Sequence, residues 1–196
     1  MTSGKPGWRA EILQLVLLVA LMTVFRSSFA DHYYVPSGSM EYTLMPGDRV
    51  IVDKTAYGIR LPLTTIDLFG AETPARGDVV VFDSPSDGTR LIKRIVAVGG
   101  DRVSLVDGHL SINGTPLGDA VTENFPDHEA LLNLTEGGGP DINGLEIPDG
   151  MVLALGDHRG NSLDGRFFGL VPETEIVGRA LKVYYRRGEG FVWKTL

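Results

Sequence analysis

Residues 90–112 read RLIKRIVAVGGDRVSLVDGHLSI, and this stretch decides the fold class. It holds three runs rich in Val, Ile and Leu, which are separated by Gly99-Gly-Asp101 and by Asp107-Gly108. Aliphatic and β-branched runs are typical of strands, and Asp-Gly between two such runs is a strong signal for a tight hairpin. The pattern therefore predicts three consecutive antiparallel strands.

Similar runs on both sides extend this pattern along the chain. None of them is followed by a long amphipathic helix, which argues against parallel βαβ units. The 25 Gly and 11 Pro residues indicate frequent turns. We therefore predict a mainly β fold, an antiparallel sheet that is either twisted and open or a partly closed barrel. The expected strands are 49–53, 77–83, 90–98, 102–106, 109–112, 151–155 and 176–185.

The segment 119–147 has a different character from the strands around it. It contains two prolines and three consecutive glycines at 137–139. Such a long stretch of turn-forming residues indicates an insertion or a mobile flap, with one candidate short helix at 127–134. We expect a smaller lobe over residues 103–150.

The N-terminal part of the chain has the composition of a membrane segment. Residues 12–25 are apolar apart from two polar side chains, and a span needs about 20 residues. Counting the flanks, we predict one transmembrane helix at 10–29. Lys5 and Arg9 precede it and predict that residues 1–9 stay in the cytoplasm.

The body of the chain, residues 30–196, would then be an extracytoplasmic β-rich domain. A cleaved signal peptide is the alternative for the N-terminus, because Ser28-Phe29-Ala30 places small residues around a suitable cleavage point.

Composition excludes several classes of protein. The 196 residues suit one domain, and 18 Lys+Arg against 25 Asp+Glu give a net charge of −7. An acidic chain is a poor binder of nucleic acid, because phosphate contacts need clustered basic residues. The absence of cysteine excludes disulfides, thiolate catalysis and cysteine-based zinc sites.

A candidate nucleophile lies in the segment 35–44, VPSGSMEYTL. Pro36 restricts the backbone and Gly38 permits a tight turn directly before Ser39. This arrangement can present a hydroxyl and neighbouring N–H groups to a substrate carbonyl. Taken alone, such a cluster is more often an ordinary loop.

A serine nucleophile needs a base, and two residue types compete for the role. His158 follows Asp157, but no strand-to-helix elbow surrounds them. Lys93 lies among apolar residues, where desolvation can make a lysine neutral. Strand alternation places Lys93 and Arg94 on opposite faces, and periodicity does not decide which of the two faces inward.

Several ordered blocks together resemble the type I signal peptidases, from the N-terminal segment to about Pro172. A single block would be unspecific, whereas four in the family's order are specific. The blocks are Pro36-Ser-Gly-Ser-Met40, Gly77-Asp-Val-Val-Val-Phe82, Ile92-Lys-Arg94 followed by Gly100-Asp101, and Gly156-Asp-His-Arg-Gly-Asn-Ser-Leu-Asp-Gly-Arg166.

The resemblance implies roles for individual residues. Ser39 would be the nucleophile and Lys93 the general base. Ser37 would join the Ser39 N–H in an oxyanion hole, and Ser162 would orient the lysine amine. Asp164 and Arg166 would form a supporting ion pair. Shallow pockets for small substrate side chains would be formed by Val35, Met40, Leu44 and Ile92.

The same resemblance implies a membrane-bound serine endopeptidase that removes signal peptides after small-x-small motifs, with no cofactor and no metal. The bacterial cytoplasmic membrane would hold it, with the catalytic domain on the periplasmic side. Its partners would be signal-peptide-bearing precursors, membrane lipid and the export machinery, and not nucleic acid. The alternatives are a relative specialised for a few substrates, a LexA-like self-cleaving protein and an inactive binding module.

The blocks depart from the usual family pattern at several positions. These departures leave both hydroxyls and the lysine in place but put local rigidity and substrate range in doubt. They are Tyr42, Gly99, His158, Gly160 and Gly165.

Overall fold

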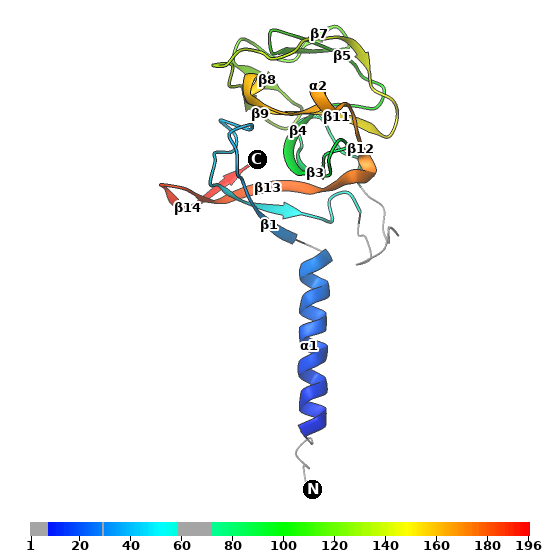
Figure 1. Ribbon diagram of the computed structural model, residues 1–196, viewed down its shortest axis with the longest axis vertical. Helices are drawn as coiled ribbons and strands as arrows, with labels where there is room; N and C mark the ends of the chain where they lie inside the picture. Colours follow the sequence, from blue (N-terminus) through cyan, green and yellow to red (C-terminus); the bar gives the residue numbers. More distant parts are fainter. Residues whose placement is uncertain (1–7, 29, 59–71) are drawn as a thin grey trace.

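The computed structural model describes residues 8–28, 30–58 and 72–196, and Figure 1 shows a β-rich body with one long helix projecting from it. Five of the expected strands have the predicted bounds, while β3 starts two residues later and β13 ends one residue later than expected. In chain order the elements are α1 (Trp8–Ser28), β1 (Ala30–Tyr34), β2 (Arg49–Asp53), β3 (Val79–Asp83), β4 (Arg90–Val98), β5 (Arg102–Val106), β6 (His109–Ile112), β7 (Thr115–Pro116), β8 (Thr122–Asn124), β9 (Glu129–Leu131), β10 (Ile142–Glu146), β11 (Met151–Leu155), the 3-10 helix η1 (Arg159–Asn161), α2 (Gly165–Phe168), β12 (Val171–Pro172), the 3-10 helix η2 (Glu173–Glu175), β13 (Ile176–Arg186) and β14 (Gly190–Thr195).

The larger sheet has the strand order β1-β2-β13-β3-β4-β11-β12, and β14 pairs with β13. Its strand pairs are antiparallel, as predicted. The edge strands β1 and β12 do not pair with each other in the described part of the chain. The sheet is therefore open, and the partly closed barrel that we considered is not formed. One edge is the two-residue strand β12, which offers the five-residue strand β1 at the other edge only a short partner.

Strand β3 lies at the centre of the hydrophobic core. It pairs with β13 on one side and β4 on the other. Val79, Val80, Val81 and Phe82 are each at most 2% exposed, so both faces of the strand are covered. A continuous apolar run, rather than an alternating one, is what such a doubly covered strand requires.

A second sheet, in the order β10-β5-β6-β7, and the hairpin β8–β9 come from residues 102–146. Most of this stretch falls in the segment where we expected a smaller lobe. The β5–β6 turn has positive φ at Asp107 (50°) and Gly108 (84°), as a tight hairpin of this type requires.

The short helix expected at 127–134 is wrong. Strand β9 occupies this position and pairs with β8. Ala130 is buried while Glu129 and Leu131 on either side are exposed. This period of two is that of a strand, and the loop-forming residues around it hid the pattern.

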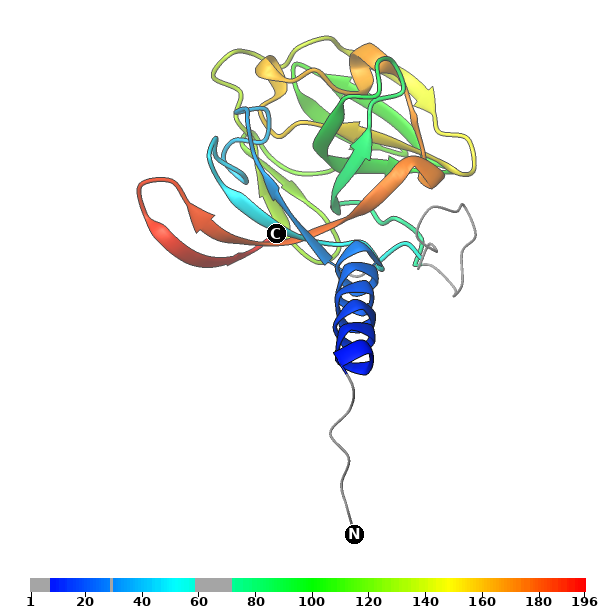
Figure 2. The same ribbon diagram turned by 60° about the horizontal axis from the view of Figure 1, so that its bottom comes forward.

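Helix α1 points away from the β-rich body in both views (Figures 1 and 2). Its described apolar side chains, among them Ile12, Leu17 and Met22, are largely exposed. The transmembrane helix predicted at 10–29 falls on this element, except for residue 29, which lies outside the described residues. Within the described part of the chain, no helix meets the length and apolarity that crossing a membrane demands.

Candidate active site

Ser39 and Lys93 meet in a buried contact. Ser39 lies in the loop between β1 and β2, and Lys93 lies in the middle of β4, opposite Val80 of β3. Lys93 Nζ donates a hydrogen bond to Ser39 Oγ over 2.5 Å. Their exposed fractions are only 3% and 8%. The fold thus brings together two residues that are 54 positions apart in the sequence.

The surroundings of Lys93 favour its neutral form. The pKa of the lysine amine is lowered from 10.5 to about 8, mainly by burial and to a smaller extent by the charge of Arg166. The carboxylates of Asp164 and Asp157 act in the opposite direction but do not cancel this effect. A neutral amine can accept a proton from a hydroxyl, which a protonated lysine cannot do.

A small pocket of about 70 Å³ opens beside this pair. Ser37 and Ser39 line it together with Lys93, and so do Val35 and Ile92. These are two of the four apolar residues predicted to contact substrate.

The other two predicted pocket residues lie elsewhere. Met40 and Leu44 have no exposed surface and pack in the core cluster that also contains Val50 and Val52. A substrate side chain does not reach them in this conformation.

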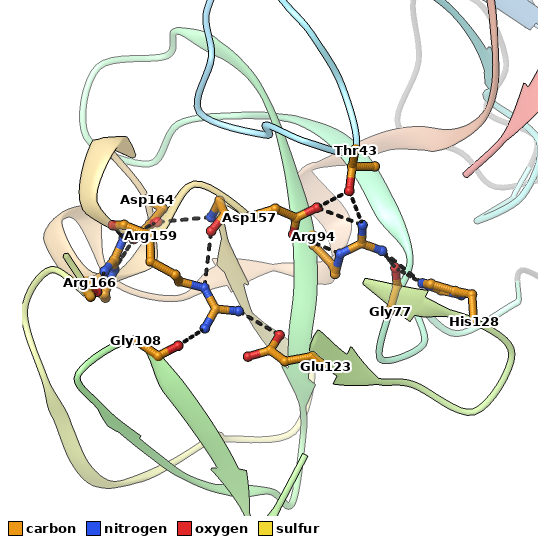
Figure 3. A network of polar contacts seen from close by, with 12 residues as sticks. Thr43, Gly77, Arg94, Gly108, Glu123, His128, Asp157, Arg159, Asp164 and Arg166 are labelled. Carbon is orange, nitrogen blue, oxygen red and sulfur yellow. Dashed lines mark hydrogen bonds and ion pairs between the residues drawn. The ribbon is translucent and has the colours of Figure 1, made fainter. Parts of the chain in front are cut away.

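Lys93 and Arg94, the neighbouring cations of β4, are both buried. The alternation of the strand did not decide which of them faces inward, and the structure shows that both do. Lys93 faces Ser39, and Arg94 faces Asp157 through two bonds of 2.9 and 2.8 Å (Figure 3). Thr43 Oγ1 donates to the same carboxylate over 2.5 Å. The Arg94–Asp157 pair therefore ties β4 to the loop that follows β11 and to the loop that carries Ser39.

His128 completes this cluster from the β8–β9 hairpin. Its Nε2 lies 2.8 Å from Arg94 Nη1 and 2.9 Å from the Gly77 carbonyl oxygen. Burial and the charge of Arg94 lower the pKa of His128. A neutral ring can accept a hydrogen bond from the guanidinium at Nε2 or donate one from Nε2 to the carbonyl oxygen, but not both at once.

A Ser/His/Asp arrangement is not present at His158. The Asp157 carboxylate is taken by Arg94 and Thr43. The ring of His158 instead faces the Gly38 carbonyl oxygen, 3.3 Å from Nδ1.

Asp164 and Arg166 form a two-bond ion pair, with 2.8 Å from Nε to Oδ1 and 2.8 Å from Nη2 to Oδ2 (Figure 3). Burial alone would raise the pKa of Asp164, but Arg166 and the Gly156 N–H outweigh it and hold that pKa below its ordinary 3.8. Arg166 also binds the carbonyl groups of Gly138 and Arg159. The pair therefore fixes both ends of the 156–166 segment.

Ser162 is buried beside this ion pair. An added Cβ at Gly156 would lie 2.2 Å from Ser162 Oγ and 2.4 Å from the Ser39 carbonyl oxygen, so the three residues converge. The Ser162 hydroxyl helps to lower the pKa of the Asp164 carboxyl group and makes no hydrogen bond to Lys93 in the described part of the chain. Its expected bond to the Lys93 amine stays a prediction.

Sequence reasoning missed the ion pair between Arg159 and Glu123. Arg159 Nη2 lies 2.6 Å from Glu123 Oε2, and both side chains are at most 2% exposed. Arg159 also donates to the carbonyls of Gly108 and Gly156 (Figure 3). No local signal identifies Glu123, because β8 lies in the stretch that reads as loop. The pair connects the β5–β10 region to the loop next to Ser39.

Known proteins resemble this chain over most of its length. A family model described as "Signal peptidase, peptidase S26" matches residues 8–185. Signal peptidase I of Pseudomonas fluorescens is 33% identical over 197 residues, which cover 86% of this chain and 69% of the relative. Probable signal peptidase I-2 of Synechocystis is 34% identical over 173 residues, which cover 85% and 68%.

A crystal structure of a signal peptidase I from Enterococcus faecalis is 31% identical and covers 55% of this chain and 97% of its own. The TM-score is 0.41, which is too low to equate the two folds.

Proposed function

We propose that Ser39 and Lys93 carry out the reaction of this chain. The chain belongs to the signal peptidase, peptidase S26 family and is therefore a peptide hydrolase that removes signal peptides. The observation that supports the pair most strongly is the 2.5 Å contact between Lys93 Nζ and Ser39 Oγ in a buried site. A nucleophile within hydrogen-bond reach of its base is the geometry that covalent catalysis requires.

Each proton in the proposed reaction passes through Lys93. The neutral amine takes the Ser39 proton as the hydroxyl oxygen attacks the scissile carbonyl. The resulting ammonium gives that proton to the leaving amine, and the C–N bond breaks to leave an acyl-serine. Lys93 then takes a proton from a water molecule, which attacks the ester carbonyl. The Lys93 ammonium returns that proton to Ser39 Oγ as the C–O bond breaks, which releases the new C-terminal carboxyl group and restores the free serine and the neutral lysine. A positioned base of this kind contributes about 10²- to 10⁴-fold in rate.

The developing oxyanion needs hydrogen-bond donors, and two lie beside the nucleophile. We assign this role to the Ser39 N–H and the Ser37 hydroxyl. Ser37 is exposed and lines the same pocket as Ser39 and Lys93, so it is free to turn toward a substrate. One such donor is worth about 10²- to 10³-fold in kcat.

The size of the pocket suits the proposed cleavage after small-x-small motifs. A volume of about 70 Å³ between Val35 and Ile92 accepts only a small side chain. Ser162, Asp164 and Arg166 would support the site from the other side, by holding the segment next to Ser39 and Lys93.

The chain would attach to a membrane through residues 10–29, with the β-rich domain on the periplasmic side of the bacterial cytoplasmic membrane. The exposed apolar side chains of α1 support this placement, because such surface is unfavourable in water. Lipid and the export machinery would then be neighbours of the site. Extraction of membranes with alkaline carbonate tests the attachment: the full chain should stay in the pellet, and a chain lacking residues 1–29 should not.

Cleavage of purified precursors by the full-length protein in detergent tests the function. The new N-termini should follow small-x-small sequences, and Ser39→Ala and Lys93→Ala should each abolish cleavage. Ser111→Ala and Lys182→Ala, which lie away from the pair, are the matched controls. Undiminished cleavage by either of the first two variants would reject the pair. A panel of precursors separates a general enzyme from a specialised one.

A further inference from the structure

His158 holds the loop that carries Ser39 at two points. Its backbone N–H donates to the Ser39 carbonyl oxygen over 3.1 Å. Its ring Nδ1 lies 3.3 Å from the Gly38 carbonyl oxygen. The side chain is almost completely buried, at 4% exposure. The proposed chemistry gives this residue no role, so its contacts need a separate explanation.

The partners of the ring define its orientation. A carbonyl oxygen can only accept, so Nδ1 carries the hydrogen in its bond to Gly38. Glu41 Oε2 lies 3.5 Å from Nδ1, and Glu136 Oε1 lies 3.5 Å from Nε2, distances that make ion pairs when the ring is protonated. Nε2 has no hydrogen-bond partner among the described residues. The two carboxylates therefore face the ring from opposite sides.

The carboxylates are themselves held by asparagines. Asn133 Nδ2 donates to Glu41 over 3.4 Å, and Asn161 Nδ2 donates to Glu136 over 3.1 Å. The backbones of Asn133 and His158 also form a parallel bridge. The segment 133–136, which follows β9, thereby contacts the Ser39 loop through His158.

We propose that His158 is a positioning residue for Ser39, which Glu41 and Glu136 flank at 3.5 Å and which fixes the Gly38 and Ser39 carbonyls. This inference rests on the proposed reaction of Ser39. A hydroxyl that attacks a carbonyl must be held in a narrow range of positions, and small displacements slow the reaction. His158 does not line the pocket beside Ser39 and Lys93, so its loss affects the position of the nucleophile more than the binding of substrate.

Two replacements of His158 separate the hydrogen bond from the volume of the ring. His158→Leu fills similar space without a donor, whereas His158→Asn keeps a side-chain donor that can reach the Gly38 carbonyl. Both keep the backbone bond to Ser39. We expect His158→Leu to lower kcat for a precursor about 3- to 10-fold, the effect of losing one hydrogen bond, with little change in KM. His158→Asn should restore most of that loss.

Glu136→Gln replaces the carboxylate that faces Nε2 of the His158 ring. Glu136 is 57% exposed, so this variant should fold even if His158→Leu does not. It should lower kcat about 2- to 3-fold, the size of a weak and partly exposed ion pair with the ring. The matched control is Glu146→Gln, which changes an exposed carboxylate paired with Arg102 and should behave as wild type.

The outcomes distinguish this inference from the function on which it rests. A folded wild-type protein that cleaves no precursor would overturn both. If the wild type is active and His158→Leu has an unchanged kcat, the positioning role alone is overturned. If His158→Leu does not fold, an unchanged kcat in Glu136→Gln has the same meaning. Equal losses of kcat in His158→Leu and His158→Asn would also overturn it. A lower Tm with normal kcat would show that the residue acts only in stability.

Discussion

Replacing Lys93 with methionine should make the protein more stable, and the gain should depend on pH. The lysine is 3% exposed, and burial lowers its pKa from 10.5 to about 8. Methionine has a similar length and carries no charge, so the variant lacks the cost of burying an ammonium group.

The size of the effect follows from the two pKa values. Below pH 8 both the folded and the unfolded protein bind the lysine proton, and the folded form carries the full penalty, about 3 kcal/mol. Between pH 8 and 10.5 the unfolded chain binds a proton that the folded protein has lost, so wild-type stability rises with pH. The advantage of Lys93→Met should therefore shrink by about 2 kcal/mol between pH 7 and pH 9.5.

Urea unfolding of the full chain in detergent, followed by intrinsic fluorescence at both pH values, measures this difference. Other titrating groups cancel, because both proteins share them. Lys182→Met, on strand β13 at a partly exposed position, is the control for the loss of a lysine as such. A difference between Lys93→Met and wild type that stays constant over this range would refute the reasoning.

Three further predictions concern the framework of the site. Arg159→Met leaves the buried Glu123 carboxylate without its partner and should cost about 3–5 kcal/mol in urea unfolding; a loss near zero would contradict the role of this pair. Asp164 has a lowered pKa in the folded protein, so its stabilising effect is present above pH 3.8 and is lost as pH falls through the folded pKa. Asp164→Asn should therefore make the free energy of unfolding less dependent on pH in acid, and an unchanged dependence would argue against the ion pair. Phe82→Ala should cost about 3–5 kcal/mol of unfolding free energy, because Phe82 is fully buried and packs edge-on against Phe168.

The strands that the sequence predicted well are those with a clear local signal. The hairpin at Asp107-Gly108 needs positive φ at both turn residues, and few sequences other than Asp-Gly supply it. The run 79–82 is apolar throughout because both faces of β3 are covered there. Strands β8 and β9 have only three residues each, so too few positions alternate to reveal a period.

The site was harder to predict, because its geometry depends on pairing across the sheet. Alternation along β4 separates Lys93 from Arg94 but does not say which face meets the Ser39 loop. The resemblance to a family selected Lys93. The fold shows why Arg94 is buried too, because the Asp157 carboxylate forms an ion pair with it. Glu123 gave no signal, and the contacts of His158 with the Ser39 loop were not predicted, since the partners of both residues are distant in the sequence.

The central claim is that a neutral Lys93 activates Ser39, and the pH dependence of kcat/KM for a purified precursor tests it most directly. The claim predicts a rise that follows a single group with a pKa of about 8, levels off at higher pH and is absent in Lys93→Ala. A rise completed near the ordinary histidine value of about 6.5, or one that begins only near 10.4, would contradict it.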